Sequence, residues 1–218
     1  MIKIESRVLG PVATNCYLII NLDNNESIIV DPADSPESIY DMVVRSASRP
    51  QAILLTHGHF DHATGAGELA QLLHIKIYAQ EKEKETLDNP QLNLSGWQGS
   101  ELVFYADEYL KDEQEIDLAG FHIRVFLTPG HTVGGCCYYF PYQNTLFSGD
   151  SLFQTSIGRT DFPKGSASQL IHAIREKLMP LPDETAVYTG HGDMTTIGTE
   201  RMYNPCLLYT SPSPRDCS

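Results

Sequence analysis

The segment THGHFDH, at positions 56–62, gathers metal-binding side chains at one point of the chain. It contains three of the eight histidines, His57, His59 and His62, together with Asp61. Imidazole nitrogens and carboxylate oxygens are common ligands of zinc and related divalent cations. Four such ligands within six positions cannot all reach one ion without strain, so the segment predicts two neighbouring metal ions.

Three further motifs supply candidate ligands of the same kinds. His131 follows LTPG, Asp150 follows LFSG and His191 follows YTG. Each residue comes after an apolar run typical of a buried strand and after a glycine, which lets the backbone turn sharply and approach a site closely. Because α/β enzymes place their chemistry where strand ends share one edge, we expect these residues to join the 57–62 cluster.

Apolar periodicity predicts the elements that position these residues. Expected strands cover Ile2–Leu9, Asn15–Asn21, Ser27–Val30, Ala52–Leu55, Ile75–Ala79, Phe121–Leu127, Cys136–Phe140, Thr145–Phe147 and Ala186–Thr189, and expected helices begin at Pro36, Gly67 and Ala167. Ser35 and Ser166 are the expected N-caps, and Gln169 completes a capping box with Ser166. Residues 80–112 are charged and less regular. This order of elements predicts a layered α/β domain rather than a helical bundle.

Composition narrows the classes of partner. The formal net charge is −13, which disfavours nucleic acid because its phosphate backbone is also anionic. No apolar run reaches the roughly 18 residues that span a bilayer, and the N-terminus lacks a signal-peptide pattern. We therefore expect no membrane partner and a cytoplasmic location. No C-x-x-C pair is present, and we expect the five cysteines to be reduced and structural.

The last segment, CLLYTSPSPRDCS, differs in character from the rest of the chain. It matches a translated sequencing-library adapter read through as coding sequence, and the alternative is a disordered tail rich in serine and proline. The sequence thus predicts one domain over residues 1–205 and a non-native tail over residues 206–218. We assign no function to the tail.

Five ordered motifs, THGHFDH, TPGHT, SGDSLF, GRTDFPKGS and GHGDMTTIGTE, resemble those of the metallo-β-lactamase fold superfamily. Within it, the chain is similar to the glyoxalase II-like (hydroxyacylglutathione hydrolase-like) metallohydrolases. The motifs cover residues 56–200, and VDPA at positions 30–33 also fits. The resemblance implies an α/β fold of the four-layer αβ/βα sandwich type, with metals at one edge of the paired sheets.

Carried over residue by residue, the resemblance implies two metal sites. The first takes His57, His59 and His131, the second takes Asp61, His62 and His191, and Asp150 bridges them. The implied cofactors are two divalent metal ions, with zinc expected and iron or manganese as alternatives. Asp31 either orients a ligand histidine or is an ordinary turn residue.

A pair of divalent ions activates water for attack on an acyl carbon. We expect Asp61 to be the catalytic carboxylate, which accepts a hydrogen bond from the attacking hydroxide and aims it. The resemblance implies a small-molecule thioester such as S-lactoylglutathione as substrate. Arg159 and Lys164 are candidate substrate-binding residues for a carboxylate, and Arg159 alternatively pairs with Asp161.

Other activities remain open at this point. Persulfide dioxygenases share the fold and the GRTDF loop, and they would use a single iron held by His57, His131 and Asp150. The GHGDMTT motif favours the hydrolase over the dioxygenase. β-Lactamases are disfavoured because they are typically exported. A binding domain without catalytic activity is disfavoured because none of the seven metal-ligand positions is missing. Longer glyoxalase II enzymes add a helical domain that helps to bind glutathione, so dependence on glutathione stays open, as does the oligomeric state.

Overall fold

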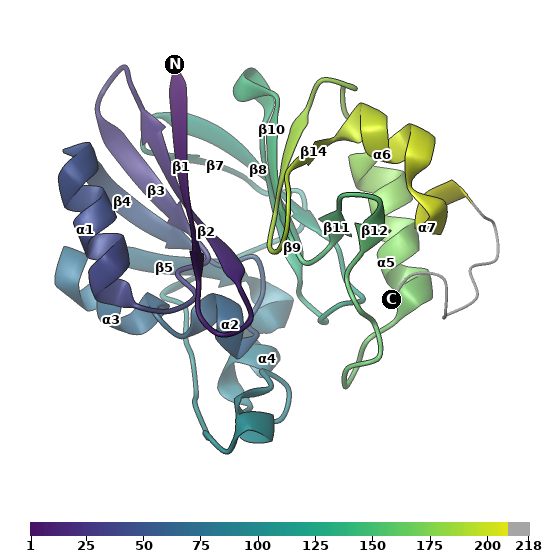
Figure 1. The fold of residues 1–218 in the computed structure, drawn as a ribbon, viewed down its shortest axis with the longest axis horizontal. Helices are drawn as coiled ribbons and strands as arrows, with labels where there is room; N and C mark the ends of the chain where they lie inside the picture. Colours follow the sequence, from purple (N-terminus) through teal and green to yellow (C-terminus); the bar gives the residue numbers. More distant parts are fainter. Residues whose placement is uncertain (209–218) are drawn as a thin grey trace.

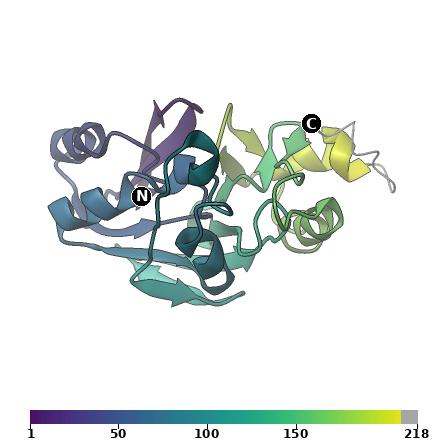
Figure 2. The same ribbon diagram turned by 90° about the horizontal axis from the view of Figure 1, so that it is seen from below.

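Two six-stranded sheets pack face to face, and helices cover the outer face of each (Figure 1). The computed structural model describes residues 1–208. The first sheet has the order β1-β2-β3-β4-β5-β6, and the second has the order β14-β13-β10-β9-β8-β7. Figure 2 gives the same arrangement from below, with the early helices on one side of the sheets and the late helices on the other.

The first sheet is antiparallel from β1 to β3 and parallel from β3 to β6. Its strands are β1 (Ile2–Leu9), β2 (Thr14–Asn21), β3 (Glu26–Val30), β4 (Arg49–Leu54), β5 (Lys76–Gln80) and β6 (Glu108–Leu110). The helices of this half are α1 (Pro36–Ser46), α2 (Phe60–Ala63), α3 (Ala66–Leu73) and α4 (Lys84–Asp88), with short 3₁₀ turns η1 (Glu81–Glu83) and η2 (Ser95–Gln98).

The second sheet is antiparallel except where β10 and β13 run parallel. Its strands are β7 (Glu115–Leu118), β8 (Phe121–Leu127), β9 (Cys136–Phe140), β10 (Thr145–Gly149), β13 (Ala186–Thr189) and β14 (Thr195–Thr196). The remaining elements are the hairpin β11 (Leu152–Phe153) and β12 (Ser156–Ile157), the 3₁₀ turn η3 (Pro141–Gln143), α5 (Ala167–Ala173), the π-helical turn η4 (Ile174–Leu178), α6 (Ile197–Tyr203) and α7 (Pro205–Leu208).

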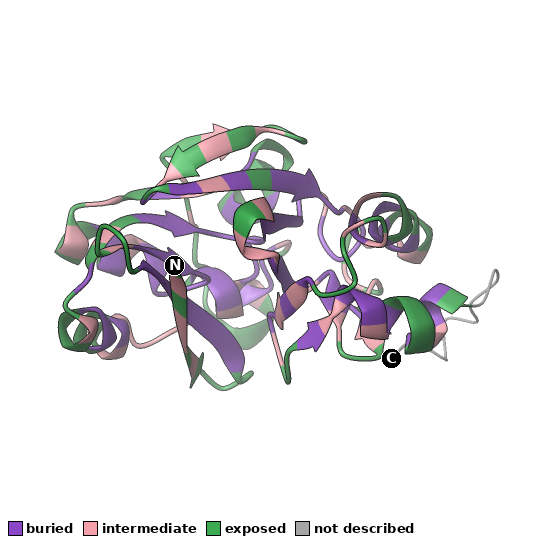
Figure 3. Cartoon of the chain, turned by 90° about the horizontal axis from the view of Figure 1, so that it is seen from above, coloured by how far each residue is buried: buried purple, intermediate pink, exposed green. Residues whose placement is uncertain are grey.

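Three hydrophobic clusters separate four layers, which confirms the predicted αβ/βα sandwich. In β2, Leu18 and Ile20 face α1 and α3, whereas Tyr17 and Ile19 face the other sheet. This period of two is what a strand covered on both faces requires. The third cluster lies between the second sheet and helices α5 to α7. Figure 3 shows the resulting concentration of buried residues in the strands.

Helix starts differ in part from the sequence-based expectation. Ser35 precedes α1, but its side chain makes no capping hydrogen bond, so that expected cap is wrong. The physical reason is its left-handed backbone, with φ of 50°, instead of the extended conformation that an N-cap residue usually adopts. Ser166 is confirmed as an N-cap, because its hydroxyl accepts from the Gln169 amide at 3.4 Å. The reciprocal bond of the predicted capping box is not formed, because the Ser166 amide donates to Gly130 O at 2.7 Å instead of to the Gln169 side chain. The helix after Ser166 continues as the π-helical turn η4.

Periodicity did not reveal several short elements, among them the edge strands, the hairpin of β11 and β12 and the helix α6. β6 and β7 are short, and their residues are largely exposed or half-buried, so no apolar run marks them. The expected tail boundary falls at α7, where Cys206 and Leu207 are buried in the third cluster. The rest of the predicted tail, residues 209–218, lies outside the described residues. In the part of the chain that the structure describes, no helix has the length and apolar character to cross a bilayer.

The cluster between the sheets allows a direct test of the packing. Phe147 is fully buried and contacts the rings of Tyr17, Phe140 and Tyr188. Phe147→Ala should lower the free energy of unfolding by about 3–5 kcal/mol, because it removes buried apolar surface and leaves a cavity. Urea denaturation measures the change. Tyr142→Ala is the matched control, since that ring is 80 % exposed, and it should cost less than about 0.5 kcal/mol.

Candidate metal centre

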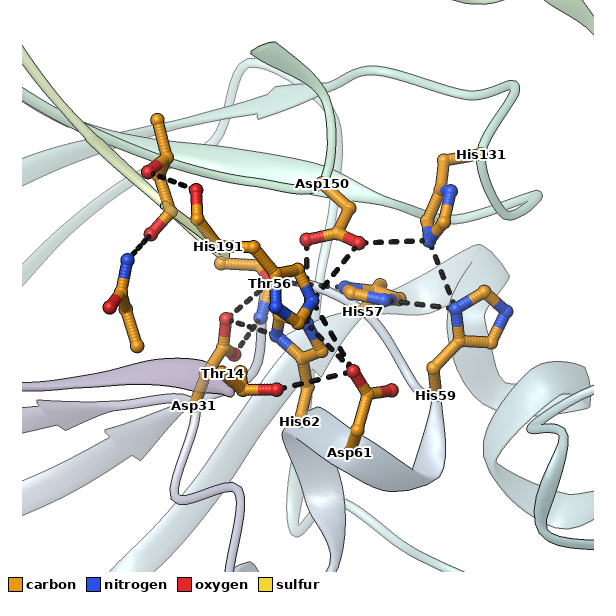
Figure 4. A network of polar contacts seen from close by, with 12 residues as sticks. Thr14, Asp31, Thr56, His57, His59, Asp61, His62, His131, Asp150 and His191 are labelled. Atoms are coloured by element: carbon orange, nitrogen blue, oxygen red, sulfur yellow. Dashed lines mark hydrogen bonds and ion pairs between the residues drawn. The ribbon is translucent and has the colours of Figure 1, made fainter. Parts of the chain in front are cut away.

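The seven candidate ligands come from both sheets and meet at one edge of the sandwich (Figure 4). Four of them lie in the segment that leads from β4 into α2. His131 follows β8, Asp150 follows β10 and His191 follows β13. The strands therefore deliver ligand-type side chains from distant parts of the chain to one place.

One group consists of His57, His59 and His131, which we call the first site. Nε2 of His57 lies 3.1 Å from His59 Nδ1, and Nε2 of His131 lies 3.0 Å from the same atom. All three side chains are buried. One ligand atom from each lies within 4.8 Å of the others, a spacing that suits donors about 2.1 Å from a shared cation.

A second group consists of Asp61, His62 and His191, which we call the second site. Asp61 Oδ2 lies 3.3 Å from His191 Nε2 and 3.7 Å from His62 Nε2. The two Nε2 atoms are 3.3 Å apart. The Thr14 hydroxyl donates to Asp61 Oδ2 at 3.2 Å, which fixes the orientation of this carboxylate.

The Asp150 carboxylate spans the two groups. Its Oδ1 lies 3.4 Å from His62 Nε2, and its Oδ2 lies 3.4 Å from His131 Nε2 and 3.5 Å from His191 Nε2. Oδ1 is buried and has no hydrogen-bond donor. A buried carboxylate oxygen without a donor is costly, and a cation between the groups would remove that cost.

Hydrogen bonds to backbone carbonyls orient two of the imidazoles. His131 Nδ1 donates to Arg159 O at 2.8 Å, and His191 Nδ1 donates to Ala13 O at 3.3 Å. A carbonyl only accepts, so Nδ1 carries the proton and Nε2 of a neutral ring is left with a free lone pair. Both lone pairs point into the cluster.

Asp31 orients two further histidines from behind the cluster. Its Oδ2 accepts from His62 Nδ1 at 2.9 Å and from the Thr56 hydroxyl at 2.6 Å. Since this hydroxyl donates to Asp31, its oxygen is free to accept from His57 Nδ1, 3.2 Å away. In the neutral rings of His57 and His62, Nε2 is therefore also left with a free lone pair, which is the ligand form that a cation requires.

The donor set thus fits two cations. In neutral imidazoles, the Nε2 lone pairs of His62 and His191 would face each other at 3.3 Å, and a cation between them would relieve their repulsion. The cluster also contains two carboxylates, Asp61 and Asp150, whose charges a cation would balance. Two clusters of histidine and aspartate are therefore present, consistent with a binuclear metal site.

The pKa shifts follow from burial and from this crowding. Burial lowers the pKa of His57, His59 and His131, because it disfavours the charged imidazolium. Burial also acts against a charge on His62, but the carboxylates of Asp150, Asp61 and Asp31 outweigh it and raise the pKa of His62 well above its usual value. The carboxylates therefore favour positive charge at the centre of the cluster.

The carboxylate pKa values shift in the complementary direction. Burial acts to raise the pKa of Asp61, but the charge of His62 and a hydrogen bond from His191 outweigh it and lower the pKa to about 2. The same balance, with His62 and His131 as the main partners, holds the pKa of Asp150 far below its usual range. Both carboxylates are ionised at neutral pH, as metal ligands must be.

Glycine allows the close approach of these loops. A Cβ on Gly190 would lie 2.2 Å from Asp150 Oδ1 and 2.8 Å from His62 Cε1. Only glycine fits beside these atoms, which explains the glycine that precedes His191.

A cavity of about 420 Å³ opens over the cluster. Its lining includes His59, Asp61, His131, Asp150 and His191 together with Val12, Phe60, Leu94, Gln98, Phe153, Arg159 and Phe162. The walls are mostly apolar, and the polar groups converge at the floor. This combination is typical of a small-molecule site.

The two candidate substrate-binding residues lie in different places. Arg159 lines the cavity, where its guanidinium stacks on Phe162 at 4.4 Å and pairs with Asp161 at 2.8 Å. Both alternatives raised for Arg159 are therefore compatible with its position. Lys164 pairs with Glu85 and is not among the residues that line this cavity.

Two of the supporting residues carried no recognisable sequence signal. Thr14 is the first residue of β2, just before the strand that the sequence predicted, and Glu83 stands within the charged run EKEKE, where nothing distinguishes it from its neighbours. Glu83 is nevertheless fully buried. Only the folded structure separates it from the exposed acidic residues beside it.

Comparison with known proteins places the chain in a family. The model of the Metallo-beta-lactamase superfamily matches residues 9–191. The chain belongs to this superfamily. The probable metallo-hydrolase YqgX of Bacillus subtilis is 37 % identical over 201 residues, which cover 91 % of this chain and 94 % of YqgX. The hydroxyacylglutathione hydrolase GloC of Haemophilus influenzae is 37 % identical over 197 residues, which cover 88 % of this chain and 92 % of GloC.

Solved structures agree with this membership. The BLEG-1 B3 metallo-β-lactamase superposes with a TM-score of 0.90 at 40 % identity, covering 95 % of this chain and 100 % of that one. TTHA1623, solved in a di-iron-bound form, superposes with a TM-score of 0.80 at 32 % identity, covering 92 % and 98 %. The predicted resemblance and fold are thus confirmed, and family and histidine-rich site together make this chain a metal-dependent hydrolase of the superfamily.

The role of Asp31 can be tested through metal affinity. Asp31→Asn keeps the shape and suits the left-handed backbone of this residue, with φ of 49°. The carboxylate accepts at both oxygens, at Oδ2 from His62 and the Thr56 hydroxyl and at Oδ1 from the Thr56 amide at 2.8 Å. An asparagine amide turns an N–H toward one of these donors, so we expect cation affinity to fall by about 10- to 100-fold. Competition with a chromogenic chelator measures it. Asp23→Asn, at the exposed β2–β3 turn, should leave the affinity unchanged.

Proposed function

We propose that this chain hydrolyses a small-molecule thioester, such as S-lactoylglutathione, with the help of two divalent cations. The convergence of the first and second sites, with the Asp150 carboxylate spanning them, carries the proposal. The relative GloC, a hydroxyacylglutathione hydrolase, supports the thioester, and the di-iron form of TTHA1623 supports two cations. Zinc is the expected metal, with iron or manganese as alternatives. The proposal includes a cytoplasmic location and no nucleic-acid or membrane partner.

The proposed ligands are the seven residues of the cluster. His57, His59 and His131 would hold the first cation, Asp61, His62 and His191 the second, and Asp150 both. When bound, such a cation pair supplies a hydroxide near neutral pH and polarises an acyl carbonyl. The free lone pairs and the buried Asp150 oxygen described above support this ligand set.

The chain's own residues orient the reactants. Asp61 Oδ2 is engaged by Thr14 and faces His191, and the carboxylate also lines the cavity. In this position it can accept a hydrogen bond from the attacking water and aim it at the acyl carbon. The apolar walls formed by Phe60, Phe153 and Phe162 exclude bulk water from the reacting groups.

A second candidate activity is hydrolysis of a β-lactam. The likeness to the BLEG-1 B3 metallo-β-lactamase, at 40 % identity over 95 % of the chain, favours it. Both reactions attack an acyl carbon, so the same constellation serves either. The substrate therefore has to be decided by assay.

The proposed function is tested by metal analysis and thiol release on one preparation. The purified protein should contain two divalent ions per chain and release thiol from S-lactoylglutathione. Asp61→Ala should lower kcat/KM by at least about 100-fold, because it removes both a ligand and the group that orients the water. Removal of the ions with a chelator should abolish turnover, and added zinc should restore it.

Controls separate the rival activities. Asp117→Ala, an exposed change on β7, should retain full activity. One bound iron with consumption of oxygen would identify a persulfide dioxygenase and contradict the hydrolase. Cleavage of the β-lactam nitrocefin without cleavage of the thioester would favour β-lactam hydrolysis as the activity. A fully active Asp61→Ala would remove the role given to that residue.

The substrate-binding residues make a separate prediction. Arg159→Ala should raise KM about three- to tenfold with little change in kcat, since one partly exposed charged hydrogen bond to the substrate is worth about 1 kcal/mol. Lys164→Ala is the matched comparison, because its partner Glu85 lies outside the cavity. Steady-state kinetics on S-lactoylglutathione measure both. An equal rise in KM for Lys164→Ala would show that Lys164 binds the substrate as Arg159 does.

A further inference from the structure

The buried carboxylate of Glu83 joins the two loops that carry the first site. Its Oε1 accepts from the Gly58 amide at 2.8 Å, in the middle of the His57–His59 segment. Its Oε2 accepts from the Gly134 amide at 2.7 Å and from the Thr132 hydroxyl at 3.0 Å, in the loop that follows His131. The side chain is fully buried, so water does not compete for these bonds.

Two glycines let the metal-binding loops pack closely against the backbone around Glu83. A Cβ on Gly134 would lie 2.2 Å from the Glu83 amide nitrogen, and a Cβ on Gly58 would lie 3.0 Å from the Leu87 side chain. The two loops therefore press against η1 and α4 from different sides. Burying an ionised or strongly polar group is costly, and three donors on one carboxylate offset that cost only in this arrangement.

Glu83 does not touch the ligands of the second site. Those ligands are oriented by Thr14, Asp31 and the Ala13 carbonyl. The hydrogen bonds of Glu83 to the metal-binding loops end on Gly58, Thr132 and Gly134, the neighbours of His57, His59 and His131. Its effect should therefore be selective for one of the two cations.

We propose that Glu83 is a positioning residue that holds the His57–His59 and His131 loops at a fixed separation and thereby sets the cation affinity of the first site. The inference rests on the proposed metal sites, but not on the thioester as substrate. Glu83→Gln makes the test, because an amide presents an N–H to one of the two loops and can accept from only the other.

The experiment titrates the metal-free protein with Co²⁺ alone and follows the visible absorption of the bound ion. A His191→Ala background leaves only the first site complete, and a His131→Ala background leaves only the second. Glu83→Gln should weaken Co²⁺ binding by about tenfold or more in the first background and by less than about twofold in the second. Equal weakening in both, or none in either, would overturn the proposal.

Glu200 provides a matched control. It is also a fully buried glutamate, and it accepts from the Thr155 amide, the Thr195 hydroxyl and the Asn204 side chain, away from the cluster. Glu200→Gln should lower the melting temperature as Glu83→Gln does, yet leave Co²⁺ affinity unchanged. If Glu200→Gln weakened Co²⁺ binding as much as Glu83→Gln does, the loss would reflect lowered stability in general, and the proposal would be overturned.

A milder variant keeps the test valid if Glu83→Gln does not fold. Thr132→Val has nearly the same shape and removes one of the three donors, so Co²⁺ binding at the first site should weaken severalfold. Unchanged binding would contradict the proposal. If the wild-type protein bound Co²⁺ normally but cleaved no thioester, the proposed substrate would be wrong. The role of Glu83 in cation binding would be unaffected by that result.

Discussion

The structure depends on a set of lone pairs that face one another. Nε2 atoms of His62 and His191 approach to 3.3 Å, and a buried oxygen of Asp150 has no donor. With both imidazoles neutral, as metal binding requires, this arrangement is unfavourable in isolation, because like partial charges meet where little water can screen them. It persists because the outer nitrogens and the strand ends are fixed by the rest of the fold. The fold therefore bears a local cost that a cation would relieve.

The residues that bear this free-energy cost come from both sheets. The first sheet contributes the segment after β4, and the second contributes the ends of β8, β10 and β13. Hydrogen bonds link the two sheets near the cluster: the Cys136 amide donates to Thr56 O, the Tyr138 hydroxyl donates to Leu55 O and the Asn15 amide donates to Gly190 O, each at 2.8 Å. These contacts set the relative position of the two halves before any ligand atom is considered.

The long strands and the metal-ligand residues could be predicted from the sequence because each has a local sequence pattern. Alternating apolar runs predicted the long strands, and the spacing of histidines and aspartates after those strands predicted which residues meet. Ser35 failed as a cap because one backbone angle, invisible in the sequence, turns it left-handed. β6 and β7 were missed because exposed edge strands carry no apolar pattern. Glu83 was missed because its burial arises only when distant loops fold onto it.

The division of the ligands between the two sheets has a consequence for folding. An ion bound by residues of both sheets binds the native chain and not the unfolded one, so it stabilises the native state by mass action, by about 2.7 kcal/mol at a free concentration one hundred times the dissociation constant. Resistance of this edge to local opening would then rise and fall with the supply of metal in its surroundings. Scarcity of the metal would loosen the sandwich where its halves meet and expose the loops there to proteases. The rate at which the polypeptide is degraded would then be linked to trace-element status.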